Sequence, residues 1–227
     1  NKAATLGTLA LGITHELSTP LGVIAGRAEQ LLSRLAGDER GTRSAQAILD
    51  QTDHIGQIIR GFLAMVRGHN PATEPLTPAA VVQGAVALVE HRFAKADVQL
   101  TTCMEDALPR IRGDLLLLEH ALINLLLNAC DACGRKGRVQ VRVTAEQGTI
   151  LFSVLDTGVG ISAADAERAM EPFFTTKPAE AGTGLGLAIA QEIVKHHRGE
   201  LQLFPRPEGG TCATIHLPSW QGENDVH

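Results

Sequence analysis

Aromatic residues are scarce in this chain. Phe, Trp and Tyr together make up 3% of its 227 residues, with one Trp and no Tyr. Proteins that hold single-stranded nucleic acid stack its bases on aromatic side chains, so this class of partner is disfavoured. The four cysteines are too few to form a disulfide scaffold at this length. We therefore expect no nucleic-acid partner and a fold that depends on buried apolar surface.

A long hydrophobic run is missing as well. The longest apolar stretch, Leu115 to Leu127, is interrupted by Glu119, His120 and Asn124 and is shorter than the roughly 20 residues that span a bilayer. The chain does not open on the charged-then-apolar pattern of a signal peptide. Yet 44% of its residues are hydrophobic and 20% are charged, which excludes wholesale disorder. The composition predicts a globular, cytoplasmic chain.

The first 68 residues are predicted to form two long helices. Apolar residues recur every three or four positions from Leu6 to Leu35 and again from Ala45 to Val66, which is typical of one helix face. The turn-rich residues 37–41 separate the two patterns. We expect an antiparallel helical hairpin that pairs with a second copy into a dimeric four-helix bundle. Packing against the rest of the same chain is the alternative.

The remainder is predicted to be a second domain of α/β type. Residues 69–75 contain two prolines and form the expected linker, the domain covers 76–218, and 219–227 form a polar tail. Helices on one face of a mixed sheet, an α/β sandwich, fit the order of elements and give the fold class α plus α/β. The expected strands lie near Leu76 and at 98–102, 139–144, 149–155, 201–204 and 211–217, and the expected helices at 79–94, 114–133 and 185–197.

The first candidate site is around His15 in the first helix. The imidazole lies roughly 200° around the helix from the core position Ile13, so it faces water. Glu16 can orient or deprotonate it, and Thr19 follows one turn later on the same face. Pro20 costs about 3 kcal/mol inside a helix and opens the backbone there. The alternative is an ordinary solvated histidine.

The second candidate is a pair of amides, Asn124 and Asn128, one turn apart in a helix rich in leucine. An amide buried without a partner costs on the order of 1–3 kcal/mol. One interpretation is two satisfied core amides. The other is an oxygen ligand for Mg²⁺, which keeps waters and phosphates as its remaining ligands.

The third candidate follows the apolar strand that ends at Leu155. Asp156 can accept a hydrogen bond from an exocyclic amine such as the purine N6. Gly158 and Gly160 let a ligand lie close to the backbone. A turn uses the same residue types, so the string alone is weak.

The fourth candidate opens the helix at 185–197. The alternate glycines Gly182, Gly184 and Gly186 offer unblocked N–H groups at the positive end of a helix, which is typical of an anion site. Lys177, with Thr176, could reach a terminal phosphate. The string matches neither a P-loop nor G-x-G-x-x-G, and a turn without function is the alternative.

Taken together and in this order, the four strings resemble the H, N, G1, F and G2 boxes of the two-component sensor histidine kinases. The fourth string covers both the F box and the G2 box. The resemblance runs from about Thr5 to Pro218. The four-residue segment between Lys177 and Gly182, with the strings NLLLNACDA and EPFFTTK, looks most like the nitrogen-regulation type of that family. The resemblance implies a dimerising helical hairpin with the phosphoacceptor, followed by the ATP-binding α/β sandwich shared with gyrase, Hsp90 and the mismatch-repair ATPases.

The resemblance also implies roles for the helical residues. His15 would take the γ-phosphoryl group of ATP, because a largely neutral imidazole keeps a lone pair at pH 7. Glu16 would accept the proton of the other ring nitrogen. Thr19 would help to place a water that dephosphorylates the partner protein. That partner would be a response regulator, whose receiver domain carries an aspartate.

In the ATP-binding domain the resemblance implies that Asn128 holds Mg²⁺, with Asn124 and Asp131 nearby. Asp131 stands where that family frequently has Lys. Asp156 would read adenine, and Thr211 would lie behind the base. The remaining residues would surround the base, ribose and phosphates: Gly158, Gly160, Thr176, Lys177, Gly182, Thr183, Gly184, Leu185 and Gly186. Positioning and charge neutralisation dominate phosphoryl transfer, and these groups would supply both.

The partners implied are a second copy, a response regulator and an upstream sensor domain that this chain lacks. The full-length protein could be membrane-anchored or soluble. Two alternatives remain open at this stage. One is a non-catalytic dimeric signalling scaffold that binds ATP only as a switch. The other is an ATPase that transfers the phosphoryl group to water, although Asn124 stands where a general base would be useful.

Overall fold

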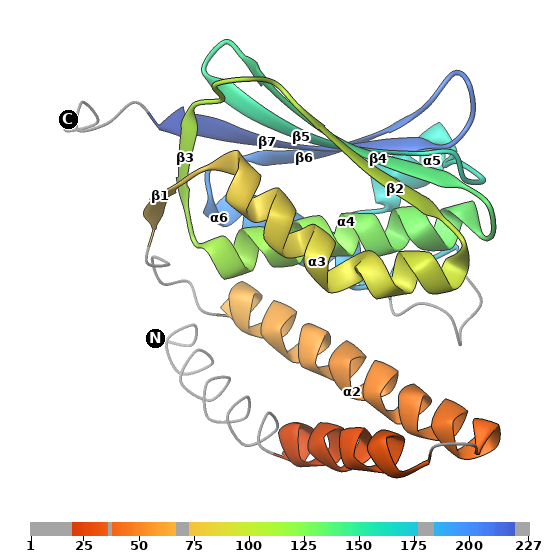
Figure 1. Cartoon of the computed structure of the whole chain (residues 1–227). Helices are drawn as coiled ribbons and strands as arrows, with labels where there is room; N and C mark the ends of the chain where they lie inside the picture. Colours follow the sequence, from red (N-terminus) through yellow and green to blue (C-terminus); the bar gives the residue numbers. More distant parts are fainter. Residues whose placement is uncertain (1–19, 36–37, 67–72, 177–183, 221–227) are drawn as a thin grey trace. The chain divides into compact units, whose positions relative to one another are not determined.

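The computed structural model describes residues 20–35, 38–66, 73–176 and 184–220 (Figure 1). The chain divides into two compact units, Asn1–Gly68 and His69–His227. Each unit is described by itself below.

The first unit is a helical hairpin made of a helix over residues 20–34 and α2 (Glu39–Val66). The Asp38 side chain caps α2, since its Oδ1 accepts the backbone N–H groups of Arg40 and Gly41, each at 3.0 Å. Such a cap satisfies donors that have no partner within the helix. The break is therefore shorter than the predicted 37–41, because Asp38 starts the helix inside that range.

Part of the apolar surface of the hairpin stays exposed. Ala28 and Ala45 are buried. The larger apolar side chains Val23, Ile24, Leu31, Ile48 and Ile55 are exposed. An exposed set of this kind on facing helices is typical of a surface that another molecule covers.

The second unit contains a seven-stranded mixed sheet in the order β1-β3-β7-β5-β4-β2, with β6 also paired to β7. The β2–β4 pair is parallel, and the other pairs are antiparallel. The strands are β1 (Glu74–Leu76), β2 (Gln99–Met104), β3 (Arg110–Gly113), β4 (Arg138–Glu146), β5 (Thr149–Asp156), β6 (Glu200–Pro205) and β7 (Thr211–Trp220). The helices are α3 (Pro78–Ala96), α4 (Leu115–Cys133), α5 (Ala163–Arg168) and α6 (Gly186–His196).

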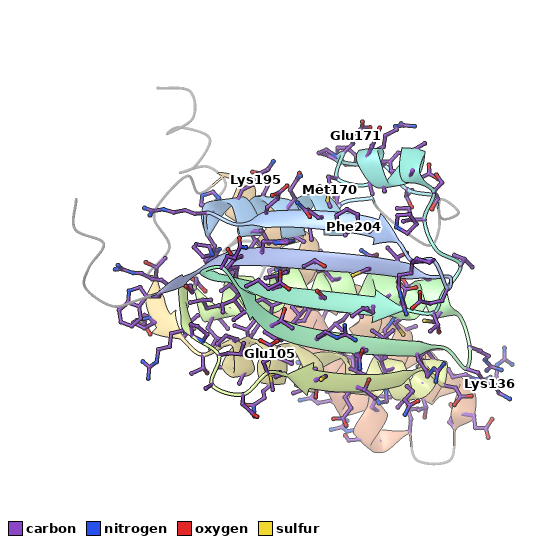
Figure 2. The ribbon with its side chains drawn as sticks, turned by 90° about the horizontal axis from the view of Figure 1, so that it is seen from above. Glu105, Lys136, Met170, Glu171, Lys195 and Phe204 are labelled. Atoms are coloured by element: carbon purple, nitrogen blue, oxygen red, sulfur yellow. The ribbon has the colours of Figure 1, made fainter. Side chains whose placement is uncertain are left out.

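Helices α3, α4 and α6 cover one face of the sheet (Figure 1). Figure 2 looks onto the opposite face, which these helices leave open. Alternate residues of β4 and β5 enter the core, because side chains alternate between the two faces of a strand. The core between the layers includes Val139, Val141, Val143, Ile150, Phe152, Val154, Leu118, Leu122, Leu125 and Leu126. The predicted helical hairpin and α/β domain with a mixed sheet are thus confirmed.

Helix α4 is the central helix of this layer. By length and composition alone it could cross a membrane, and it is the one such helix in the described part of the chain. More than half of that apolar window is buried inside the domain. Its buried leucines Leu118, Leu122, Leu125 and Leu126 therefore belong to the core beneath the sheet.

Two predicted boundaries and two elements need correction. Strand β1 begins at Glu74, so the predicted linker 69–75 extends two residues too far. Strand β7 continues to Trp220, inside the predicted tail, because Ser219 and Trp220 pair with Ile111 and Arg110 of β3. Strand β3 was not predicted, since four residues with one large buried side chain give almost no pattern. Helix α5 was also missed, because it is only six residues long and buries none of them.

The last turn of α6 is joined to the start of α4 by His197, which is 5% exposed. Its Nε2 accepts the backbone N–H of Asp114 at 3.0 Å. The other nitrogen, Nδ1, therefore carries the proton and donates to the carbonyl of Ile193 at 2.7 Å. His197 thus links two helices whose residues lie 83 positions apart in the sequence.

We expect the link to make the second unit sensitive to acid. Burial lowers the pKa of His197, against the raising effects of its bond to Ile193 and the charge of Asp114; the neighbouring His196 lowers it further. Because the folded pKa lies below the unfolded one, the stabilisation is present above about pH 6.5 and is lost as the pH falls. Urea unfolding followed by the fluorescence of Trp220, between pH 5 and 8, measures this. His197→Gln should flatten the pH dependence, and His91→Gln, at an exposed histidine of α3, should not; equal slopes for all three proteins would contradict the assignment.

Candidate nucleotide-binding site

The structure brings most of the described candidate residues into the region where α4, α6 and the end of β5 meet. Asn124 and Asn128 lie on α4, Asp156 ends β5, and Gly186 begins α6. Six of the predicted residues lie outside the described ranges: His15, Glu16, Thr19, Lys177, Gly182 and Thr183. Thr176 is described and exposed.

The two amides of α4 face the start of α6. Gly186 has no side chain, and a Cβ placed there would lie 3.5 Å from Asn124 Oδ1 and 3.9 Å from Asn128 Nδ2. Asn124 is 8% exposed, and its Nδ2 has no hydrogen-bond partner in the described part of the chain. Since an unpartnered buried amide is costly, a ligand at this position explains Asn124 better than the alternative of a satisfied core amide.

The start of α6 offers N–H groups beside these amides. Within the described ranges no side chain caps the helix at Leu185, and Gly184 has a positive φ of 66°. The first N–H groups of an 11-residue helix therefore have no intrahelical acceptor. Together with the helix dipole they favour an anion.

Gly184 also joins this helix start to the segment that follows α5. Its carbonyl accepts the backbone N–H of Phe173 at 3.0 Å. A Cβ on Gly184 would lie 2.5 Å from the Phe173 carbonyl carbon and 2.7 Å from the Phe174 oxygen. The absence of a side chain at Gly184 thus permits close packing of two backbone segments.

Asp156 is the most buried acidic side chain of the site, at 4% exposed. Its Oδ1 accepts the backbone N–H groups of Gly158 at 2.8 Å and Thr211 at 3.2 Å. Burial raises the pKa of the carboxyl, and these two bonds and the charge of Arg206 act against that rise. No described residue donates to Oδ2, which leaves this oxygen as an acceptor for a ligand. Thr211 contacts Asp156 through its backbone.

Gly158 lies close against the last turn of α4. A Cβ there would lie 2.5 Å from the Ala132 carbonyl oxygen and 2.8 Å from the Ala132 Cβ. The next residue, Val159, donates its N–H to the same Ala132 oxygen at 3.1 Å. Because Gly158 has no side chain, the last turn of α4 can pack directly against its backbone. The sequence showed a glycine but not the helix that comes to lie against it.

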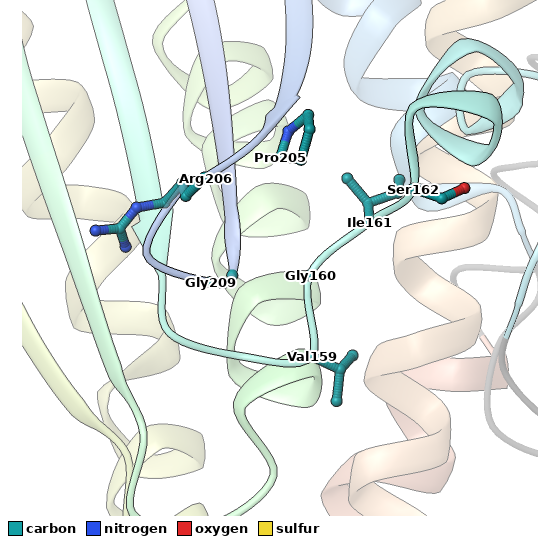
Figure 3. A pocket seen from close by; sticks show the side chains of 8 residues that line it. Val159, Gly160, Ile161, Ser162, Pro205, Arg206 and Gly209 are labelled. Atoms are coloured by element: carbon teal, nitrogen blue, oxygen red, sulfur yellow. The ribbon is translucent and has the colours of Figure 1, made fainter.

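Gly160 lies beside an open cavity of about 300 Å³. Its φ is 78°, a conformation that other residues rarely adopt. Figure 3 shows the cavity between the loop after β5 and the β6–β7 turn. Its lining residues are Val159, Gly160, Ile161, Ser162, Pro205, Arg206, Gly209 and Gly210.

Asp131 lies on α4, three positions after Asn128. Its Oδ1 accepts a hydrogen bond from Arg92 Nη2 of α3 at 2.9 Å. Both side chains are partly exposed, so the pair contributes little to stability. Sequence reasoning missed Arg92 and Arg206, because each reaches a site residue about 40 or 50 positions away in the sequence.

The buried carboxylate after a strand, the amides on a core helix and the uncapped glycine-rich helix start agree with an ATPase domain of the type shared by histidine kinases, DNA gyrase B and HSP90. The sequence family described as histidine kinase-, DNA gyrase B- and HSP90-like ATPase matches residues 113–221. The His Kinase A (phospho-acceptor) domain matches residues 5–71. The chain belongs to the sensor histidine kinases and corresponds to their catalytic core. These matches do not single out the nitrogen-regulation type.

Relatives and solved structures agree with this family. The sensor histidine kinase ZraS of Escherichia coli (strain K12) is 32% identical over 217 residues, which cover 96% of this chain and 46% of ZraS. The chain thus spans less than half of that relative. The catalytic domain of histidine kinase ThkA has a TM-score of 0.59 at 26% identity, over 65% of this chain and 95% of that domain.

A second ThkA structure shows the fold of both units. It is a complex of ThkA with the response regulator protein TrrA, and its TM-score is 0.64 at 20% identity. The match covers 96% of this chain and 63% of that one.

Proposed function

We propose that this chain transfers the γ-phosphoryl group of ATP to His15 and then passes it to an aspartate of a response regulator. The observation that carries the proposal is the buried Asp156, whose Oδ2 has no donor among the described residues, in a domain of the histidine kinase ATPase type. The phospho-acceptor domain match over residues 5–71 includes His15.

ATP would be recognised at both of its ends. The adenine N6 amine would donate to Asp156 Oδ2, while Gly158 and Thr211 hold Oδ1 in place. The phosphates would lie at the N–H groups of Gly184, Leu185 and Gly186, where the helix end favours negative charge. Thr176, Lys177, Gly182 and Thr183 are proposed from the sequence to enclose the same phosphates.

The amides of α4 that face the start of α6 also fit Mg²⁺. Asn128 offers an amide oxygen one turn from Asn124, and the unpartnered Nδ2 of Asn124 indicates that this place accommodates a polar ligand. Magnesium prefers such oxygens and takes its remaining ligands from waters and phosphates. When bound, the ion would neutralise phosphate charge. We assign Asn128 as the ligand, with Asn124 and Asp131 in support.

In the helical hairpin, His15 would be the nucleophile and Glu16 the proton acceptor. Thr19 would orient a water for the dephosphorylation of the regulator, so we also propose a phosphatase activity. The complex of ThkA with TrrA supports a regulator as the partner of this fold. The short segment between Lys177 and Gly182 is the basis for proposing the nitrogen-regulation type.

We further propose that two copies form a dimer through their hairpins. The exposed Ile24, Leu31, Ile48 and Ile55 would be covered in a four-helix bundle. ZraS is about twice as long as this chain, which is consistent with an upstream sensor domain in the whole protein. The catalytic core would work in the cytoplasm, with or without a membrane anchor elsewhere in the protein.

The experiment that tests the function is incubation with ATP labelled at the γ-phosphate. A kinase should acquire label that is labile in acid and stable in alkali, as expected for a phosphorylated imidazole. A non-catalytic scaffold that binds ATP as a switch should bind the nucleotide and acquire no label. An ATPase that transfers the phosphoryl group to water should release labelled phosphate, and the protein should acquire no label.

Asp156→Asn should weaken ATP and ADP binding tenfold to a hundredfold. A hydrogen bond to a charged acceptor contributes roughly 1.5–3 kcal/mol, and the amide can also turn a donor towards the adenine amine. The parent protein should bind GTP poorly, because the 6-oxo group would meet the carboxylate acceptor to acceptor. Calorimetry with ATP, ADP and GTP measures both effects. Asp106→Asn, an exposed carboxylate outside the site, should bind like the parent; equal ATP and GTP affinities in the parent would overturn the role of Asp156.

A further inference from the structure

The turn between β6 and β7 carries an arginine that the proposed mechanism does not use. The backbone N–H of Arg206 donates to the Gly210 carbonyl, and the N–H of Gly209 donates to the Arg206 carbonyl, each at 3.1 Å. The turn is thus closed by its own backbone. The Arg206 side chain is 18% exposed and lines the cavity seen in Figure 3.

The guanidinium of Arg206 reaches the nucleotide site. Its Nη1 donates to the backbone carbonyl of Asp156 at 2.6 Å. Its Nη2 donates to Glu208 Oε1 at 3.0 Å, and Glu208 is largely exposed. Because the guanidinium is planar and its donors are fixed, Glu208 helps to set the direction in which Nη1 points.

The same turn also lies directly against Asp156. A Cβ on Gly210 would lie 2.8 Å from the Asp156 carbonyl carbon and 2.9 Å from its Oδ1. Thr211, the next residue, supplies one of the two N–H groups that hold Oδ1. The backbone of Asp156 is held by Arg206, and its carboxylate is held by Gly158 and Thr211.

The charge of Arg206 acts on Asp156 as well. Burial raises the pKa of Asp156, and Arg206 is the one charged side chain in the described part of the chain with a resolved opposing effect. Glu208 faces Arg206 on the same turn. On the neighbouring elements, Asp131 of α4 pairs with Arg92, and Arg138 of β4 contacts Thr157 through its backbone.

We propose that Arg206 is a positioning residue for adenine recognition, which fixes the backbone of Asp156 and keeps its carboxylate an acceptor. The inference rests on the proposed adenine-reading role of Asp156. It assigns the β6–β7 turn a part in nucleotide affinity, although the turn itself would not contact the base.

The test is ADP binding by calorimetry between pH 5.5 and 8, with the whole chain and with Mg²⁺ held constant. Arg206→Met keeps the length of the side chain but removes its charge and donors. It should weaken ADP binding about tenfold at pH 7.5. The loss of binding on the acid side should begin at a higher pH than in the parent, because Asp156 then protonates more readily. Titration of ADP itself cancels when the variants are compared at each pH.

Two further variants separate positioning from general damage. Arg206→Lys retains the charge and should restore most of the acid-side behaviour. Arg142→Met, an exposed arginine of β4 bonded to Gln140, should match the parent at every pH. A loss in Arg206→Met that is the same at every pH, or no rescue by lysine, would overturn the proposal.

An error in the adenine-reading role of Asp156 and an error in the role of Arg206 would give different binding data. If Asp156→Asn binds ADP as the parent does, the adenine-reading role is wrong and the role of Arg206 falls with it. If Asp156→Asn loses affinity while Arg206→Met keeps the pH profile of the parent, only the role of Arg206 is wrong. In the double variant of Asp156→Asn and Arg206→Met, the pH shift should disappear.

Discussion

His15→Gln should abolish labelling of the protein by γ-labelled ATP. Glutamine is neutral and of similar length, but its amide nitrogen has no lone pair available for attack on phosphorus, whereas neutral imidazole has one. Label should therefore fall to background while ADP affinity stays unchanged. The measurement is acid-labile, alkali-stable label on the purified protein, with the far-ultraviolet circular dichroism recorded beside it.

The other histidines make the claim specific. The chain has nine. His197 is buried and uses both ring nitrogens in backbone hydrogen bonds, so it has no lone pair for attack. His196 is exposed at the end of α6 and makes a matched control. His196→Gln should keep full labelling, and residual label in His15→Gln would show that another histidine accepts the phosphoryl group.

Glu16→Ala should lower the rate of autophosphorylation about a hundredfold or more. This is the usual scale of the loss when a general base is removed. The adjacent carboxylate would otherwise take up the imidazole proton as the phosphoryl group arrives. Because binding of ATP takes place in the second unit, its affinity should not change.

Thr19→Ala should remove phosphatase activity and leave autophosphorylation nearly unchanged. Alanine has a high helix propensity and adds no bulk, so His15 and the hairpin should keep their arrangement. Autophosphorylation should stay within a few-fold of the parent, and most phosphatase activity on the cognate regulator should be lost. The paired measurement is label incorporation and loss of phosphate from the purified phosphorylated regulator with ADP present.

The proposed separate roles of Glu16 and Thr19 can be tested on the same set of variants. Circular dichroism and the dimer mass should be the same in the parent, Glu16→Ala and Thr19→Ala. If Thr19→Ala lost both activities equally with fold and mass unchanged, separate roles for the two residues would have to be given up.

The long apolar elements of the second unit were predictable from sequence. Helix α4 and strand β5 carry continuous apolar patterns that depend on their own residues alone. Asp156 was predicted as a site residue because it ends such a strand. Short elements were not predictable in this way: β3 exists because its ends pair with β1 and β7, which lie far away in the sequence.

Contacts between residues far apart in the sequence were also not predictable at the site. The glycine string indicated Gly158, but the Ala132 backbone against it comes from a helix more than twenty residues earlier. Arg206 stands between two prolines in a turn, with no motif around it. Its bond to Asp156 exists only because β7 brings the turn beside the end of β5. Residue types can suggest a ligand, whereas the supporting contacts follow from topology.

The bond between Phe173 and Gly184 has a consequence for variation in chain length. It holds together two points of the backbone that are eleven positions apart, so the chain between them begins and ends at one place in the domain. For such a closed loop, each doubling of length costs only about 0.6 kcal/mol in entropy. Insertions and deletions between these two anchors should thus leave the sheet and its helices standing. The number of residues between Phe173 and Gly184 can therefore differ between proteins, or be changed by engineering, while the hydrophobic core stays the same.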